Sequence, residues 1–131
     1  MTTMKHPPKG SRVLVCGGRT FENYELVDVT LTILHKDEYG PIGLIINGGA
    51  RGADYLARRW ALQQNVLVHT YSAQWNLYGR RAGIVRNKKM LDEGMPDLVV
   101  AFEGGKGTKN MVAQATKRGV KVLIVNPAKW E

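Results

Sequence analysis

The sequence has little of what disulfide-bonded, metal-binding or membrane proteins need. Cys16 is the single cysteine among 131 residues, so no internal disulfide can form, and a reducing, cytoplasmic location is expected. The histidines His6, His35 and His69 are scattered without a second ligand at metal spacing, and we expect no metal site. Residues 1–10 lack the apolar stretch of a signal peptide or membrane anchor, which predicts a flexible tail and no membrane contact.

The rest of the chain, residues 11–131, has an even composition with no linker, and it is expected to form a single domain. Apolar residues make up 44% of the sequence, enough for one sizeable core. Lysine and arginine together number 19 against 11 aspartates and glutamates, a formal net charge of +8. This excess favours an anionic partner, which could be a nucleotide, a nucleic acid or an acidic surface.

Short β-branched runs alternate with amphipathic segments, a pattern typical of βαβ units. It predicts strands at about 12–16, 43–47, 66–70, 97–102 and 121–125. It predicts helices over 22–36, 53–64, 80–92 and 108–118. The clearest stripe has Ala53, Leu56 and Trp60 at helical spacing, and Asn23 is expected to cap the first helix. The expected fold is α/β, a Rossmann-like three-layer α/β/α sandwich with a mainly parallel five-stranded sheet.

Three of the predicted strands end in paired glycines, at 17–18, 48–49 and 104–105. In an open parallel sheet the carboxyl ends of the strands share one edge, where ligands bind. The helices that follow would offer unpaired N–H groups there, and glycine lets an anion approach them closely. Each pair could instead be a tight turn, but three on one edge favour a phosphate site. Each loop also has a neighbouring cation: Arg19, Arg51 and Lys106.

Standard nucleotide motifs do not account for these loops. The run Gly17-Gly18-Arg19-Thr20 lacks the later glycines of the dinucleotide fingerprint, and Gly107 stands where a Walker A loop needs serine or threonine. Ordinary NAD oxidoreduction and P-loop hydrolysis are therefore disfavoured, and no bound cofactor is expected.

The segment 72–91 places two aromatic residues, Trp75 and Tyr78, before a basic cluster. The cluster consists of Arg80, Arg81, Arg86, Lys88 and Lys89. Aromatic rings can stack on a base and arginine can grip phosphate in a planar fork, which together suit a nucleotide. The alternative is a core tryptophan beside a solvated basic helix face, and it is favoured for the two lysines.

Four motifs in order, "VLVCGGRTF" at 13–21, "INGGARGAD" at 46–54, "WNLYGRRAGIVRNKKML" at 75–91 and "VVAFEGGKGT" at 99–108, make a family resemblance visible. The chain resembles the YspA-like, YpsA-related group within the SLOG superfamily. That resemblance implies a Rossmann-like fold related to the LOG phosphoribohydrolases and to DNA-processing protein A. It also implies a nucleotide-derived ligand, such as an NAD or ADP-ribose derivative, and a homodimer.

Carried over by position, the resemblance assigns ligand contacts to four segments of this sequence. They are Gly17, Gly18, Arg19 and Thr20; Gly48, Gly49, Arg51, Gly52 and Asp54; Arg81, Gly83, Arg86 and Asn87; and Gly104, Gly105, Gly107 and Thr108. The sequence departs from the LOG enzymes where these have two glutamates, since Asn110 and Met111 stand there, and Glu103 replaces a proline. Cleavage of an N-glycosidic bond needs a carboxylate, and Asn110 and Met111 supply none. An enzyme would have to use Asp54 or Glu103 instead, and an enzymatic role stays open.

The leading hypothesis is a sensor or sequestering protein that binds a nucleotide-derived small molecule. Its phosphates would lie in the three loops, with their charge complemented by Arg19, Arg51, Arg81 and Arg86. Asp54 would accept from a ribose hydroxyl, and Trp75 or Tyr78 would face the base. One alternative is a divergent nucleotide hydrolase, N-glycosidic or phosphoester, that uses Asp54 or Glu103. Another is single-stranded nucleic-acid binding, which the charge suggests.

Overall fold

Strands and helices alternate along the chain as the apolar pattern predicts. The computed structural model describes residues 10–37 and 39–125, so nearly all of the tail expected at 1–10 lies outside the described residues. The strands are β1 (Ser11–Cys16), β2 (Ile42–Asn47), β3 (Leu67–Thr70), β4 (Leu98–Ala101) and β5 (Lys121–Ile124). The helices are α1 (Tyr24–Lys36), α2 (Ala53–Gln63), α3 (Trp75–Tyr78), α4 (Ala82–Gly94) and α5 (Lys106–Lys117), with a 3-10 turn η1 (Gly79–Arg81) before α4.

The five strands form one parallel sheet in the order β3-β2-β1-β4-β5. From β1 the chain moves outward through β2 to β3, and then returns to the other side of β1 with β4 and β5. The strand order therefore reverses between β1 and β4, which is where open α/β sheets leave a crevice at their carboxyl edge. The predicted Rossmann-like fold is confirmed.

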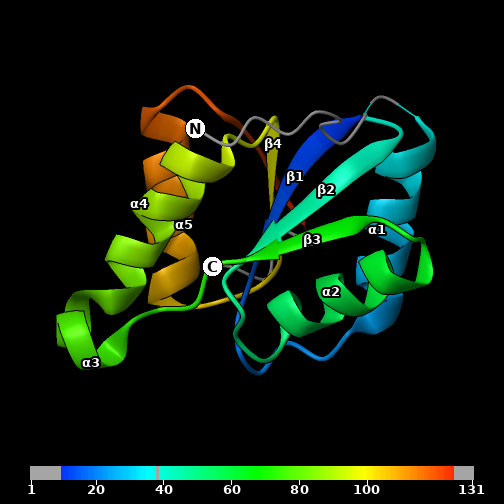
Figure 1. Cartoon of the computed structure of the whole chain (residues 1–131). Helices are drawn as coiled ribbons and strands as arrows, with labels where there is room; N and C mark the ends of the chain where they lie inside the picture. The colour runs from blue at the N-terminus through cyan, green and yellow to red at the C-terminus, as the bar shows by residue number, and fades with distance from the viewer. Residues whose placement is uncertain (1–9, 38, 126–131) are drawn as a thin grey trace.

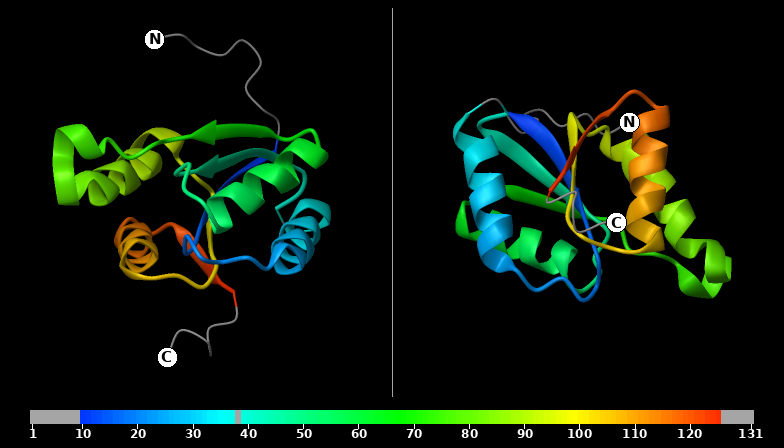
Figure 2. Two further views of the ribbon diagram at one scale, coloured as in Figure 1. Left: turned by 90° about the horizontal axis from the view of Figure 1, so that it is seen from below. Right: turned by 180° about the vertical axis from the view of Figure 1, so that it is seen from behind.

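Helices cover both faces of the sheet (Figure 1), with α1 and α2 on one side and α4 and α5 on the other. The two further views show the same three layers (Figure 2) and show α3 projecting beyond the body of the molecule at the start of α4. The helix pair α4 and α5 and the carboxyl ends of β1 and β4 are the elements that enclose the site described below.

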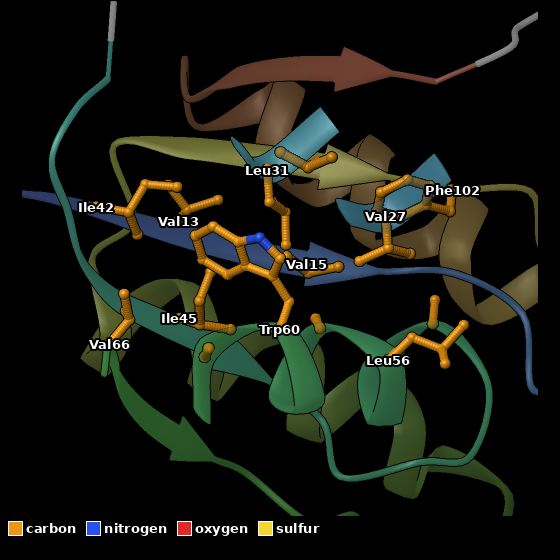
Figure 3. Close-up of a cluster of buried hydrophobic side chains, with 14 of the residues drawn as sticks. Val13, Val15, Val27, Leu31, Ile42, Ile45, Leu56, Trp60, Val66 and Phe102 are labelled. Atoms are coloured by element: carbon orange, nitrogen blue, oxygen red, sulfur yellow. The ribbon is translucent and has the colours of Figure 1, made fainter. Parts of the chain in front are cut away.

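The core on the α1 and α2 side is built around Trp60, which α2 places against the sheet (Figure 3). The indole is fully buried, and its Nε1–H donates to the Thr32 hydroxyl at 3.1 Å. Ala53 and Leu56 are buried on the same stripe, as the helical spacing predicts. On the other face Leu14, Ile46, Met90, Val99 and Met111 join a second buried cluster. The two cores fix the strands, and with them the loops at their ends.

Candidate functional site

Hydrogen bonds hold the three glycine loops together at the switch point of the sheet. The Gly18 N–H donates to the Glu103 carbonyl at 2.9 Å, and the Ala53 N–H donates to the Gly18 carbonyl at 3.2 Å. The first loop is thus bonded to the other two. Glycine is needed at this junction, because an added Cβ at Gly104 would lie 2.7 Å from the Gly18 nitrogen. At Gly52, where φ is +78°, it would lie 2.1 Å from the Gly18 oxygen.

A cavity of about 660 Å³, the main cleft, opens between these loops and helices α4 and α5. Its charged lining side chains, among the described residues, are Arg19, Arg80, Arg86, Lys106 and one carboxylate, Asp54. The volume lies within the range of roughly 300–1,000 Å³ of small-molecule sites. Four cations against one carboxylate give the cleft the positive field that an anionic ligand needs.

The start of α5 is the part of the cleft best suited to a phosphate. The helix begins after Gly105 without a side-chain cap, and Lys106, Gly107 and Thr108 line the cleft. The first N–H groups of a helix lack intrahelical partners and carry the positive end of its dipole. An added Cβ at Gly105 or Gly107 would meet no atom within 4 Å. Packing therefore does not require glycine at these two positions, and the open space beside them can admit a ligand.

The other two loops differ from the expectation of bare amides. In the second loop the Gly49 N–H donates to Asn47 Oδ1 at 2.9 Å, and the Ala50 N–H donates to Asp54 Oδ2 at 3.1 Å. After the first loop, Asn23 Oδ1 caps α1 by accepting from a backbone N–H at 3.0 Å, as predicted. The protein's own side chains thus occupy donors that we expected to face a phosphate. Arginine side chains must supply the positive charge there.

Asp54 lies in the first turn of α2, where its side chain closes the second loop. The residue is only 7% exposed, and burial is the largest influence on its carboxyl, raising its pKa to about 6. Hydrogen bonds from the Ala50 and Gly48 backbone and the charges of Arg86 and Arg19 act in the opposite direction. The side chain thus has a structural role in the second loop, and its place in the cleft lining also lets it contact a ligand.

Arg86 on α4 is held in a fixed position beside the second loop. Its Nη1 donates to the Gly48 carbonyl at 2.8 Å, and its Nε donates to Asn87 Oδ1 at 3.1 Å. Desolvation lowers the pKa of the guanidinium, but arginine stays charged in proteins. The side chain therefore presents a preorganised positive charge to the cleft.

The same hydrogen bond orients a chain of amides that runs to α5. Arginine can only donate, so Asn87 must turn its oxygen to Arg86 and its NH₂ group away. That NH₂ group donates at 3.1 Å to the Gly107 carbonyl and at 3.1 Å to Asn110 Oδ1, which also accepts from Gln114 Nε2 at 2.8 Å. With its oxygen already used by two donors, Asn110 has its own NH₂ group as the free donor at the cleft wall.

A smaller pocket of about 270 Å³, the arginine pocket, adjoins the main cleft. The two share Arg19, Ala50, Trp75 and Arg86 in their linings. Trp75 is 50% exposed, and the Arg19 guanidinium carbon lies 5.6 Å from its ring centroid, in a cation–π contact. The tryptophan is therefore a cleft wall and not a core residue.

Most of the residues predicted to bind the ligand lie together around these two cavities. They are Gly17, Gly18, Arg19, Gly48, Gly49, Arg51, Gly83, Asp54, Trp75, Arg86, Asn87, Gly105, Gly107 and Thr108. Gly52 and Gly104 instead serve the close contact between loops. Tyr78 and Arg81 line neither cavity, and Thr20 and Glu103 line a separate pocket of about 210 Å³.

Some lining residues escaped the prediction. Arg80 lines the main cleft in place of its neighbour Arg81, because the turn η1 sets which of the two faces inward. Adjacent arginines in the sequence carried no signal to choose between them. Ser72, in the arginine pocket, had no signal at all. Asn110 had one, since it stands where LOG enzymes have a glutamate.

The thiol of Cys16 lies at the main cleft, at the end of β1. Burial and the nearby carboxylate of Asp54 raise the pKa of this thiol far above the ordinary value, so it is not a reactive thiolate. Over residues 10–37 and 39–125, no three His, Cys, Asp or Glu side chains gather as metal ligands would. The same part of the chain contains no helix that is both long and apolar enough to span a membrane.

A charged cleft at the switch point of a doubly wound parallel sheet defines the class: an α/β protein of the Rossmann-like type. The chain belongs to the YspA, cpYpsA-related SLOG family, whose model matches residues 11–78. This confirms the resemblance found in the sequence. The matched residues include the first two glycine loops and Trp75.

Two similar proteins extend this finding. The Gene 61 protein of Mycobacterium phage D29 is 37% identical over 120 residues, which cover 86% of this chain and 94% of the phage protein. DNA processing protein A (DprA) from Streptococcus pneumoniae is similar in fold, with a TM-score of 0.68 at 17% sequence identity. That similarity covers 88% of this chain and 50% of DprA, so the chain spans about half of DprA. The family and the fold of the chain are therefore both shown, the family by its model and the phage relative and the fold by its likeness to DprA.

Proposed function

We propose that the protein binds a nucleotide-derived small molecule in the main cleft, as a sensor or sequestering protein. The observation that carries the proposal is the uncapped start of α5, which opens beside Gly105 and Gly107 into a cavity rich in cations. A phosphate there would accept from the first N–H groups of the helix and from Lys106. An uncharged ligand would gain less from these N–H groups and cations than a phosphate does.

The remaining contacts follow from the lining of the cleft. Arg86, fixed by its two hydrogen bonds, adds positive charge to the cleft beside the second glycine loop. Trp75 offers the face that a base can stack on, provided that Arg19 moves from its cation–π contact or that the base uses the other face. Asp54 lines the cleft and can accept from a ribose hydroxyl in addition to its backbone hydrogen bonds.

Binding without chemistry is favoured over hydrolysis because a free carboxylate is scarce in the cleft. Met111 is fully buried in the core, and Asn110 offers an amide where LOG enzymes have an acid. Glu103 lies at the separate pocket, away from the cleft lining. Asp54 is the acidic residue that remains, and it already closes the second loop.

The proposal is tested by thermal-shift measurements with AMP, ADP-ribose and NAD. A ligand at about a hundred times its dissociation constant should add roughly 2.7 kcal/mol to the free energy of unfolding. Lys106→Gln should lose most of the shift, and Lys109→Gln, on the same helix but outside the cleft lining, should keep it. Equal responses in the two variants would show that the ligand does not bind at the start of α5. Chromatography of the mixtures distinguishes binding from hydrolysis, because a binder returns its ligand unchanged.

Single-stranded nucleic-acid binding is the second candidate, and the net charge of +8 favours it. The similarity in fold to DNA processing protein A is compatible with it. Affinity for such a ligand should rise with oligonucleotide length and fall steeply with salt. If AMP binds as tightly as long strands do, the site recognises a single nucleotide, and single-stranded nucleic-acid binding is excluded.

We also propose that two copies of the chain associate and that the protein works in the cytoplasm, as the resemblance and the single cysteine led us to expect. Light scattering coupled to size-exclusion chromatography would measure the mass in solution. A monomer mass at micromolar concentration would exclude the dimer.

A further inference from the structure

The arginine pocket is a second cation-rich cavity beside the proposed phosphate site. Its lining includes Arg19, Arg51 and Arg86, the second glycine loop, and Ser72. Among the described residues no acidic side chain lines it, whereas Asp54 lines the main cleft. Three arginine residues around about 270 Å³ of space, without a lining carboxylate to balance their charge, favour an anionic occupant.

Recognition in this pocket would come from guanidinium groups more than from backbone amides. The N–H groups of Gly49 and Ala50 already donate to Asn47 and Asp54. Arg86 is held through Nη1 and Nε, and Nη2 is the guanidinium nitrogen that these two hydrogen bonds leave unused. Arginine forks bind phosphate oxygens with charge-assisted, often bidentate hydrogen bonds. A phosphoryl group is therefore the anion that fits this chemistry best.

One molecule can occupy both cavities, because their linings are continuous. Arg19, Ala50, Trp75 and Arg86 line the main cleft and the arginine pocket alike. The arginine pocket, at about 270 Å³, is smaller than the roughly 300–1,000 Å³ of sites that hold a whole drug-sized ligand. It suits one end of a ligand whose larger part lies in the main cleft.

We propose that the arginine pocket is a subsite for a second phosphoryl group, so that the ligand is a nucleotide carrying two of them. The first phosphoryl group lies at the start of α5, beside Lys106, and the second lies among Arg19, Arg51 and Arg86. This inference rests on the proposed function. It adds the charge and the class of the ligand.

The second phosphoryl group can come from a diphosphate chain or from a phosphate on another position of the sugar. ADP represents the first source, adenosine 3′,5′-bisphosphate represents the second, and AMP carries one phosphate. Calorimetric titration of the full chain with all three measures what the added group contributes. At least one of the two doubly phosphorylated probes should bind about tenfold or more tightly than AMP, as expected for charge-assisted hydrogen bonds. The probe that does so identifies the source.

Three single substitutions separate the two cavities. Arg51 lines the arginine pocket and not the main cleft, Lys106 lines the main cleft and not the arginine pocket, and Arg81 lines neither. Arg51→Gln should leave AMP binding within about twofold of the unchanged protein and reduce the tighter probe to the affinity of AMP. Lys106→Gln should weaken all the probes, and Arg81→Gln should weaken none. Arg51 is exposed, so thermal melting should confirm an intact fold.

Two results overturn the inference and leave the proposed function standing. In the first, AMP binds in a manner that depends on Lys106 and neither second phosphate adds affinity. In the second, Arg51→Gln weakens AMP as much as it weakens the doubly phosphorylated probes. If none of the three nucleotides binds the unchanged protein, the proposed function and the inference fail together.

Discussion

The carboxylate of Asp54 accepts a hydrogen bond from the backbone N–H of Ala50 at 3.1 Å, across the turn that opens α2. The bond joins a nearly buried acid to the second glycine loop, within reach of the charge of Arg86. Burial disfavours the charged carboxylate by more than these contacts favour it, and the pKa of Asp54 rises from 3.8 to about 6. The loop is thus closed by an acid whose charged form the fold disfavours.

The stability of the protein should therefore carry a pH dependence that Asp54→Asn removes. The folded state favours the protonated carboxyl, so this contribution is complete below the ordinary value near 3.8 and is lost as the pH rises through about 6. Relative to the Asn variant, the unchanged protein should lose on the order of 2 kcal/mol between pH 4 and pH 7. Urea unfolding of both proteins at pH 4, 5, 6 and 7 measures the difference, in which other titrating groups cancel. If the free energies of unfolding of the two proteins change in parallel with pH, the Asp54 carboxyl titrates in the folded protein as it does in the unfolded chain.

The fold could be predicted from the sequence because its signals are periodic and long. The stripe through Trp60 repeats at helical spacing, and the run at Leu14 and Val15 is short, rich in valine and followed by paired glycines, as a buried strand is. The short helix α3, Trp75–Tyr78, was missed, since four residues hold a single turn and give no period. It matters for function because it carries Trp75 to the cleft.

The site could be predicted only to the level of its loops. All three glycine loops gather at the edge that parallel topology dictates, but the sequence could not say which of their amides stay free. That depends on which side chains reach back, as Asn47 and Asp54 do in the second loop. The choice between Arg80 and Arg81 depends likewise on the rotation of one turn.

Two glycines that the sequence treats alike should respond differently to substitution. At Gly105 φ is −100° and an added Cβ meets nothing within 4 Å. Gly105→Val should therefore fill ligand space and abolish the AMP-induced thermal shift, at a cost in stability of about 1 kcal/mol or less. At Gly49 φ is +73° and the added Cβ would lie 2.8 Å from Thr70 Cγ2. Gly49→Ala should cost about 1–3 kcal/mol.

The two variants serve as controls for each other in thermal melts with and without AMP. Gly105→Val should lose the response with at most a small drop in melting temperature, whereas Gly49→Ala should lower the melting temperature clearly before any ligand is added. A destabilised Gly105→Val with a normal ligand response would contradict the assignment of that space to the ligand.

Asn110 should act as a neutral donor at the start of α5, and Asn110→Asp should reverse its effect on an anion. The aspartate can still accept from Asn87 and Gln114, as Asn110 Oδ1 does at 3.1 and 2.8 Å, so the fold should persist. It replaces the free NH₂ group by a negative charge beside the phosphate, and affinity for AMP should fall about tenfold or more.

The control for net charge is Lys109→Gln, which makes the protein more negative by the same amount from the exposed side of α5. Calorimetric titration of AMP at 50 and at 200 mM salt compares the two variants. Lys109→Gln should weaken binding slightly at low salt and hardly at high salt, because exposed charges are screened. Asn110→Asp should weaken it at both. Equal losses in the two variants would mean that AMP senses only the overall charge of the protein, and the donor role of Asn110 would be wrong.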